Sequence, residues 1–182
     1  HPGIVKLFEV GEHEGTHFFA MELIEGPTLA EHEANRQDTG AASPAGNRVR
    51  TTAERIADVA HALDYAHRHG VIHRDIKPHN ILLGPNGRVC LVDFGLAKEI
   101  ANVSVTASGA FAGTLRYASP EQAAGEPVDS RTDIYSLGAV LFEQLTGEAP
   151  FGDASDGQIL VALQSDEPRP LRRVRECAPR DL

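Results

Sequence analysis

One β-hairpin is the feature of the sequence that most restricts how this chain can fold. Two apolar runs, Ile81 to Leu83 and Val89 to Val92, flank a stretch of turn-forming residues, Gly84-Pro85-Asn86-Gly87. A polar stretch precedes the first run, and Asp93 follows the second. Because a tight turn places the open ends of two strands side by side, the polar residues at these ends are expected to converge on one spot.

The converging residues have the chemistry that phosphoryl transfer requires. Asn80 and Asp93 lie at the two open strand ends and can share a cation, and Asp75 and Lys77 lie just upstream of Asn80. Transfer from a nucleoside triphosphate needs a divalent ion, a carboxylate that orients the attacking hydroxyl, and a cation near the transferred group. A lone Asp or Lys would be interpreted as a solvated loop charge, but four such residues in one pattern are not expected by chance.

This pattern, His73-Arg74-Asp75-Ile76-Lys77-Pro78-His79-Asn80 followed by Asp93-Phe94-Gly95, resembles the catalytic and metal-binding segments of serine/threonine protein kinases of the bacterial, eukaryotic-like type. The resemblance implies ATP as phosphoryl donor, with Mg²⁺ or alternatively Mn²⁺. It assigns Asp75 as the catalytic base, Lys77 as the γ-phosphate contact, and Asn80 and Asp93 as metal ligands. The implied partners are proteins with Ser or Thr acceptors.

Two later segments extend the resemblance. Gly113 to Glu121 resembles the substrate-docking loop of the family, and Asp133 to Gly138 resembles its central buried helix, in which Asp133 anchors the catalytic-loop backbone. The resemblance implies that Thr114 bridges Asp75 and Lys77, which favours Ser/Thr over Tyr as acceptor. It also implies that Arg74 reads a phosphate on the intervening loop, where the candidate phosphorylation sites are Ser104, Thr106 and Ser108.

The start of the chain resembles the nucleotide-binding side of a kinase. His1 to Val5 resembles the entry to the fourth strand of the small lobe. The implied hinge, whose backbone would pair with adenine, is Met21, Glu22, Leu23 and Ile24. Thr28 lies where the family often contacts ribose, and Leu82 lies where it packs under the base, although Leu82 is interpreted almost equally well as a core residue.

Hydrophobic periodicity and turn residues predict an α+β fold. Strands are expected over residues 4–10 and 17–24 and in the hairpin. A capping box of Thr28 and Glu31 predicts a short helix that fades by Gln37, and a second capping box, Thr51 with Glu54, predicts the start of a helix that ends at Gly70. Residues 38–50 are expected to form an exposed loop. Further helices are predicted over residues 131–146, with Ile134, Leu137, Leu141 and Leu145 on its apolar face, and 158–163.

The resemblance implies a protein-kinase-like fold in which residues 1–27 belong to the small lobe and hinge. Residues 28–182 would form most of a mainly helical large lobe without its C-terminal helices. The glycine-rich loop of the family, its strand lysine and the helix glutamate paired with that lysine would all precede His1. We therefore expect this polypeptide to be part of a longer kinase and to have negligible activity by itself.

Composition excludes several classes of function. A formal net charge of −9 without a block of Lys or Arg argues against nucleic acid or an anionic membrane as partner. Two cysteines, Cys90 and Cys177, form no disulfide framework and no zinc motif, which favours the reducing cytoplasm. The apolar stretch 134–142 is too short to span a membrane. A parent kinase of this type often carries a membrane anchor elsewhere.

Two other functions stay open at this stage. A shortened kinase fold can act as a binding module without catalysis, but a binding module does not need Asp75, Asn80 and Asp93 together. A small-molecule phosphotransferase of related fold would not need the docking segment that ends at Glu121. The sequence indicates neither the substrate nor the oligomeric state.

Overall fold

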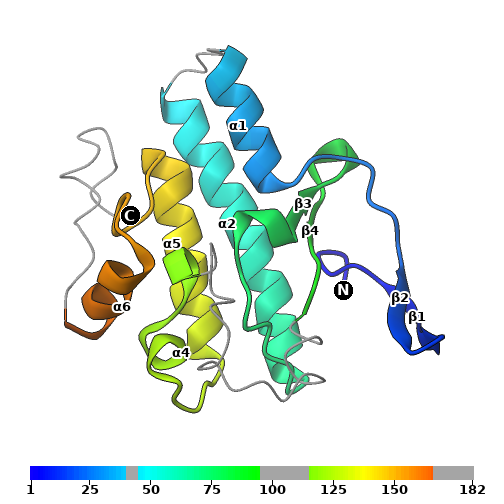
Figure 1. The fold of residues 1–182 in the computed structure, drawn as a ribbon. Helices are drawn as coiled ribbons and strands as arrows, with labels where there is room; N and C mark the ends of the chain where they lie inside the picture. Colours follow the sequence, from blue (N-terminus) through cyan, green and yellow to red (C-terminus); the bar gives the residue numbers. More distant parts are fainter. Residues whose placement is uncertain (40–44, 95–114, 166–182) are drawn as a thin grey trace.

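The computed structural model describes residues 1–39, 45–94 and 115–165. These residues form two small antiparallel sheets and a larger helical body (Figure 1). The α+β class predicted from the sequence is confirmed.

The first sheet is a hairpin of β1 (Leu7–His13) and β2 (Thr16–Met21). Its turn uses Glu14 and Gly15, both with positive φ. The predicted strand bounds were shifted, because Ile4 bridges to Leu91 of the second sheet instead of belonging to β1. This hairpin extends to one side of the helical body (Figure 1).

The second sheet is the hairpin predicted around the central turn. It consists of β3 (Ile81–Leu83) and β4 (Val89–Leu91), with Ile81 opposite Leu91. A single 3-10 turn, Pro85–Gly87, joins them, and its Gly87 has a φ of 77°, which a residue with a β-carbon rarely adopts. Four of its six strand residues are at most 5% exposed, so this small sheet belongs to the core.

Helix α1 (Leu29–Thr39) begins at the first predicted capping box. The Thr28 hydroxyl accepts a hydrogen bond from the Glu31 amide (3.1 Å), and the Glu31 carboxylate accepts one from the Thr28 amide (2.8 Å). These bonds satisfy N–H groups that a helix start leaves unpaired. The prediction for this helix is confirmed.

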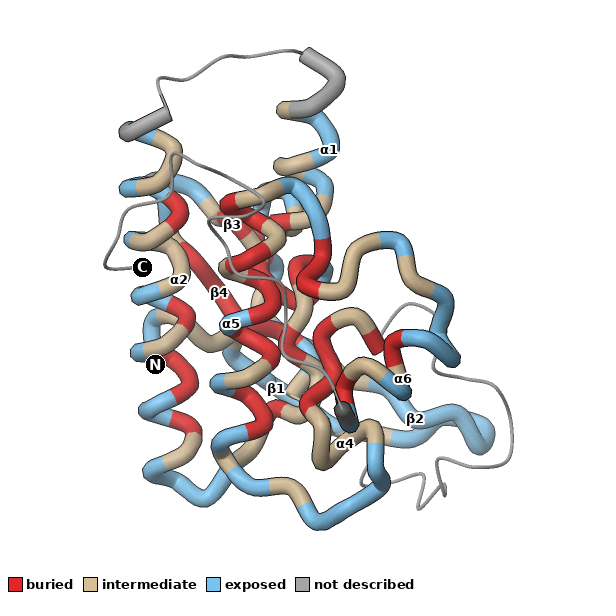
Figure 2. Tube along the Cα trace, turned by 90° about the vertical axis from the view of Figure 1, so that its left-hand side faces the viewer, coloured by how far each residue is buried: buried red, intermediate tan, exposed pale blue. Residues whose placement is uncertain are grey.

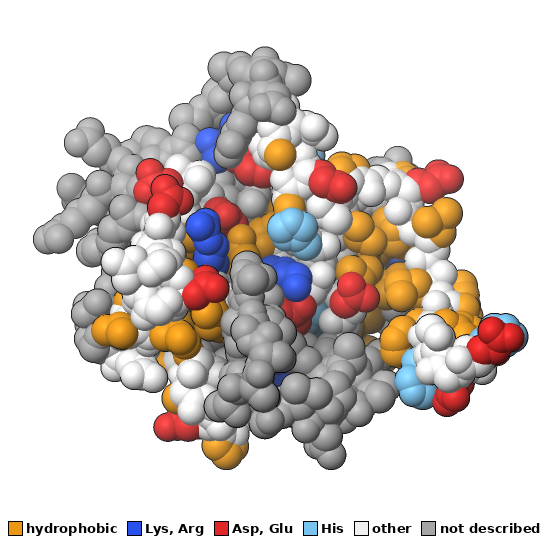
Figure 3. All heavy atoms as spheres, viewed as in Figure 1, with side chains coloured by type: hydrophobic (Ala, Val, Ile, Leu, Met, Phe, Trp, Pro, Cys, Tyr) orange, Lys and Arg blue, Asp and Glu red, His pale blue; other side chains and the backbone are white. Residues whose placement is uncertain are grey.

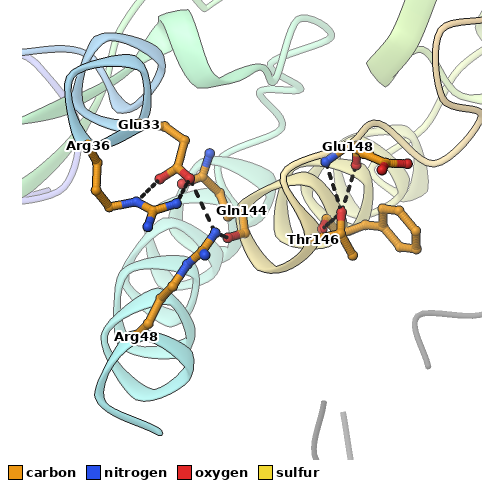
Figure 4. A network of polar contacts seen from close by, with 7 residues as sticks. Glu33, Arg36, Arg48, Gln144, Thr146 and Glu148 are labelled. Atoms are coloured by element: carbon orange, nitrogen blue, oxygen red, sulfur yellow. Dashed lines mark hydrogen bonds and ion pairs between the residues drawn. The ribbon is translucent and has the colours of Figure 1, made fainter. Parts of the chain in front are cut away.

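Helix α2 (Ala45–Arg68) begins six residues before the predicted capping box at Thr51. The predicted helix start was therefore wrong, as was the predicted loop over residues 45–50, while residues 40–44 lie outside the described residues. The first turns of α2 are held by tertiary contacts. Arg48 donates to the Glu33 carboxylate of α1 (3.2 Å) and to the Gln144 carbonyl of helix α5 (Arg131–Thr146) at 2.9 Å, while Arg36 also pairs with Glu33 (Figure 4). A helix start supported by contacts far away in the sequence leaves no local signal.

Helix α5 (Arg131–Thr146) has the predicted bounds and ends at Gly147, which has a φ of 84°. It packs against α2, and the core lies between these helices and the second sheet (Figure 2). Of the predicted apolar face, Ile134 is 55% exposed, so it does not face the core. The most buried core side chains from these two helices are Val59, Ala62, Leu63 and Val140.

Two short helices complete the described fold. Helix α4 (Pro120–Ala124) follows a 3-10 turn, Leu115–Tyr117, and was not predicted. Helix α6 (Asp156–Ser165) includes the predicted segment 158–163. Leu115 and Ala118 form a second small core with Ile159 and Leu163 of α6. Among the described residues, no helix is long and apolar enough to cross a membrane.

Candidate active site

The loop between α2 and β3 brings three of the predicted site residues together. The Lys77 ammonium donates to Oδ2 of Asp75 at 2.8 Å. The Asn80 amide nitrogen donates to the same oxygen at 3.0 Å and to the Asp75 carbonyl at 2.9 Å. The carboxylate of Asp75 is thus held by a cation and an amide from the next five residues of the chain. Charged and polar side chains gather near the middle of this face of the molecule (Figure 3).

A buried carboxylate holds the loop through hydrogen bonds to its backbone. Asp133, at the start of α5, is 0% exposed. Its oxygens accept hydrogen bonds from the backbone amides of His73 (2.9 Å) and Arg74 (2.8 Å), and Oδ2 also lies 2.7 Å from Nε2 of His67. A buried carboxylate needs such partners. These hydrogen bonds therefore tie the backbone of His73 and Arg74 to the buried start of α5.

The hairpin brings Asn80 and the residue before Asp93 together. The backbone amide of Val92 donates to the Asn80 carbonyl at 3.1 Å, so the chain on either side of the hairpin is paired up to the residue before Asp93. Asp93 has a φ of 58° and is exposed. Non-glycine residues with positive φ are uncommon and often occur at functional sites.

The chemistry of these two side chains fits Mg²⁺. Because Nδ2 of Asn80 is used in two hydrogen bonds to Asp75, the amide oxygen is left to face other ligands. Asp93 adds an exposed carboxylate, and oxygen atoms are what Mg²⁺ prefers. Magnesium in nucleotide sites is held by one or two protein groups together with phosphates, so Asn80 and Asp93 are sufficient protein ligands. Within the described residues, no group of three or more His, Cys, Asp or Glu could hold a metal.

His73 links the two halves of the site through a neutral ring. Its Nε2 lies 2.9 Å from the Val92 carbonyl and donates to it, and its Nδ1 accepts from the Asp75 amide at 3.3 Å. Its ring also packs on Phe94, with centroids 4.5 Å apart. Burial lowers the pKa of His73, and this effect outweighs the opposite influence of the Asp133 carboxylate.

The lowered pKa of His73 predicts a pH dependence of stability. The unfolded chain binds a proton near pH 6.5, whereas the folded chain does so only at lower pH. The contribution of neutral His73 to the free energy of unfolding is therefore complete above about pH 6.5. Below that pH it declines, by at most about 1.4 kcal/mol per pH unit for one group. Burial lowers the pKa of His32 as well, so wild type contains two such groups.

We expect His73→Gln to reduce the loss of unfolding free energy between pH 7.5 and 5.5, measured by urea titration. His61→Gln, at an exposed position of α2, is the control and should keep the wild-type difference. An identical pH difference in all three proteins would contradict the assignment.

The segment predicted as the hinge follows β2. The Glu22 amide donates to the Lys6 carbonyl at 2.8 Å, and the Glu22 carboxylate pairs with Arg88 at 2.7 Å. Leu23 is 83% exposed, whereas Ile24 is buried. Arg88 also donates to the Pro2 carbonyl at 2.9 Å. Arg88 therefore ties both the Glu22 segment and the start of the chain to the β3–β4 turn.

The other predicted nucleotide contacts lie next to this segment. Thr28 bridges to Leu82, which is half-buried in β3. Thr28 uses its hydroxyl to cap α1, so its contact with ribose stays a prediction, as do the roles of Leu82 and Met21. The remaining predicted residues, Ser104, Thr106, Ser108 and Thr114, lie outside the described residues.

Several polar residues at the site were not assigned a role from the sequence. These residues are His67, Arg88 and Gln122. Gln122 had a usable signal, since it stands three positions after Ser119, which is the spacing of a capping box.

Comparison with known proteins identifies the class of protein to which this fold and site belong. Residues 1–174 match the family model described as "Protein kinase domain". The chain therefore belongs to the protein kinase family, as its motifs predicted.

Relatives refine this to bacterial serine/threonine kinases. The chain is 42% identical to serine/threonine-protein kinase PknB of Mycolicibacterium smegmatis, over 98% of this chain and 28% of that protein. It is 43% identical to serine/threonine-protein kinase PknJ of Mycobacterium tuberculosis, over 88% of this chain and 26% of that protein. It is 39% identical to a probable PknB of Lactococcus lactis, over 90% of this chain and 25% of that protein. The chain thus spans between a quarter and three tenths of the length of these relatives.

Proposed function

We propose that the full-length product of the gene transfers the γ-phosphoryl group of ATP to Ser or Thr hydroxyls of protein substrates, and that residues 1–182 alone have negligible activity. The observation that supports this proposal is the Asp75–Lys77–Asn80 cluster, on a loop whose backbone is bonded to Asp133. Asn80 is also paired with Val92, the residue before Asp93. Family membership and the names of the relatives support the same reaction. The proposal includes residues 1–27 as small-lobe strands and hinge, residues 28–182 as large lobe, and action in the cytoplasm, where ATP is supplied.

Each residue has a chemical role in this proposal. Asp75 accepts a hydrogen bond from the incoming hydroxyl and takes its proton as the hydroxyl oxygen bonds to the γ-phosphorus, while the bond from that phosphorus to the bridging β,γ-oxygen breaks and ADP leaves. Lys77, already 2.8 Å from Asp75, offsets the charge of the transferred group. Asn80 and Asp93 would hold Mg²⁺, whose charge would offset that of the phosphate oxygens. The hinge Met21–Ile24 pairs with adenine, and Thr28 and Leu82 line the nucleotide.

The proposal predicts a change in metal dependence when a ligand is removed. In the full-length product of the gene, Asn80→Ala is expected to raise the Mg²⁺ concentration needed for half-maximal transfer by about tenfold or more, because one oxygen ligand is lost. Asp93→Asn is expected to remove transfer at any Mg²⁺ concentration. Asn35→Ala, on α1 away from the site, serves as the amide control.

The assay uses radiolabelled ATP with a mixed protein substrate and identifies the labelled amino acid after acid hydrolysis. Labelled Ser and Thr are the expected products. Label on a small molecule alone would replace the protein-kinase proposal with a small-molecule phosphotransferase. ATP-independent partner binding, with no transfer by the wild type, would indicate a non-catalytic module.

A further inference from the structure

The position of the catalytic carboxylate depends on one strained peptide. Arg74 has a φ of 64°, in the left-handed region that a residue with a β-carbon rarely adopts. Such a conformation persists only where its surroundings hold it. Asp75 follows directly, so a rotation of the peptide between Arg74 and Asp75 would move the Asp75 carboxylate away from its partners.

Hydrogen bonds hold this peptide and the one before it. The Arg74 amide donates to Oδ1 of Asp133 at 2.8 Å, and the Asp75 amide donates to Nδ1 of His73 at 3.3 Å. The Arg74 carbonyl accepts from Nε2 of Gln122 at 2.8 Å. The last bond is the shortest one on the peptide that carries Asp75, and it comes from α4, 48 residues further along the chain.

The amide of Gln122 is itself fixed in the required orientation. Its Oε1 accepts from the Ser119 amide at 3.1 Å, and its own backbone amide donates to the Ser119 hydroxyl at 3.3 Å. Ser119 is 0% exposed, and its hydroxyl is bonded to that of Thr132 at the start of α5. Since Oε1 is used by the cap, Nε2 is the atom presented to Arg74.

We propose that Gln122 is a positioning residue for phosphoryl transfer, whose side-chain amide locks the Arg74–Asp75 peptide and so fixes the catalytic carboxylate. This inference rests on the proposed function, which gives Asp75 its role. The Gln122–Arg74 hydrogen bond also connects α4, which overlaps the end of the segment that resembles the substrate-docking loop, to the catalytic loop. Gln122 touches neither the nucleotide nor the metal ligands in this role.

One substitution separates positioning from helix capping. Glu is accepted at the third position of a capping box, so Gln122→Glu keeps an acceptor for the Ser119 amide. It removes the donor to Arg74 and places a carboxylate against the carbonyl oxygen. Gln158 is a matched control, since its Oε1 accepts from the Ser155 amide at 2.9 Å at the exposed start of α6. Gln158→Glu makes the same exchange far from the catalytic loop.

The kinetic test compares these two variants with the wild type as full-length proteins. We expect Gln122→Glu to lower kcat by about 10- to 100-fold, as small displacements of catalytic groups do, with KM for ATP unchanged within about twofold. Gln158→Glu should match the wild type in both constants, and both variants should have similar Tm. Equal kcat values for all three proteins would overturn the proposal, as would an equal loss in both variants.

A second measurement does not depend on activity. Hydrogen exchange of the Asp75 amide is expected to be about tenfold faster in Gln122→Glu than in Gln158→Glu, because the peptide opens more often. Unchanged exchange would show that Gln122 does not hold the peptide. If the wild type transfers no phosphate, the proposed function fails, and the exchange rates alone then decide whether this contact fixes the loop.

Discussion

Asp75→Asn is expected to lower phosphoryl transfer by about 10²- to 10⁴-fold, the range that removal of a general base produces. An amide of the same shape cannot take the proton of the attacking hydroxyl. It also presents either an NH₂ group or a neutral oxygen to Lys77, which lies 2.8 Å from the native carboxylate. The measurement is kcat of the full-length protein under saturating ATP and Mg²⁺.

Stability and nucleotide binding should change little in this variant, because the side chain is isosteric and only partly buried. Asp58→Asn, at an exposed position of α2, is the matched control and should retain wild-type kcat. Transfer within tenfold of wild type for Asp75→Asn would remove Asp75 from the role of base and leave the proposed mechanism without its central residue.

Asp133→Ala is expected to have the largest effect on stability. It leaves the amides of His73 and Arg74 buried without their acceptor, and each such loss costs about 1 to 3 kcal/mol. The sum is a large part of the stability of an ordinary domain, which is about 5 to 15 kcal/mol. We therefore expect a reduction of unfolding free energy by about 3 kcal/mol or more, measured by urea titration.

Asp133→Asn covers the case in which the alanine variant does not fold. The asparagine keeps one oxygen acceptor but turns an NH₂ group toward a donor, so both stability and kcat should fall. Asp153→Ala, at a fully exposed position, should leave both quantities at wild-type values. A stable Asp133→Asn protein with normal kcat would show that the buried carboxylate does not support the catalytic loop. Asp75→Asn, in contrast, should lower kcat alone.

The parts of the fold that were predicted correctly have strong local signals. The β3–β4 hairpin has turn-forming residues that predict a tight connection between its two strands. Helix α5 has apolar residues with a 3.6-residue period and ends at Gly147. The start of α2 was predicted wrongly because the Thr51–Glu54 spacing suggests a cap, whereas Arg48 binds Glu33 and Gln144 and extends the helix. Similarly, Ile4 pairs with Leu91 instead of continuing β1.

At the site, too, residues grouped by a local motif were found from the sequence, whereas tertiary contacts were not. Asp75, Lys77 and Asn80 lie within six residues of one another, so a linear motif was enough to group them, and the hairpin pairs Asn80 with the residue before Asp93. Gln122 of α4 binds the loop at the Arg74 carbonyl, and His67 of α2 binds the Asp133 carboxylate that holds the loop. No spacing in the sequence encodes such a contact, because it depends on how the helices pack.

The sequence by itself determined the class of the protein and most of its regular elements, because these depend on short-range spacing and periodicity, and it is the source of the proposal for the residues that carry the chemistry. The tertiary structure alone decided how the catalytic carboxylate is held in place. At Arg74, whose backbone is left-handed, Asp133 binds the amide and Gln122 binds the carbonyl, and both residues belong to helices that follow much later in the chain. Contacts of this kind form when the core packs, and their energy is a property of the folded chain as a whole.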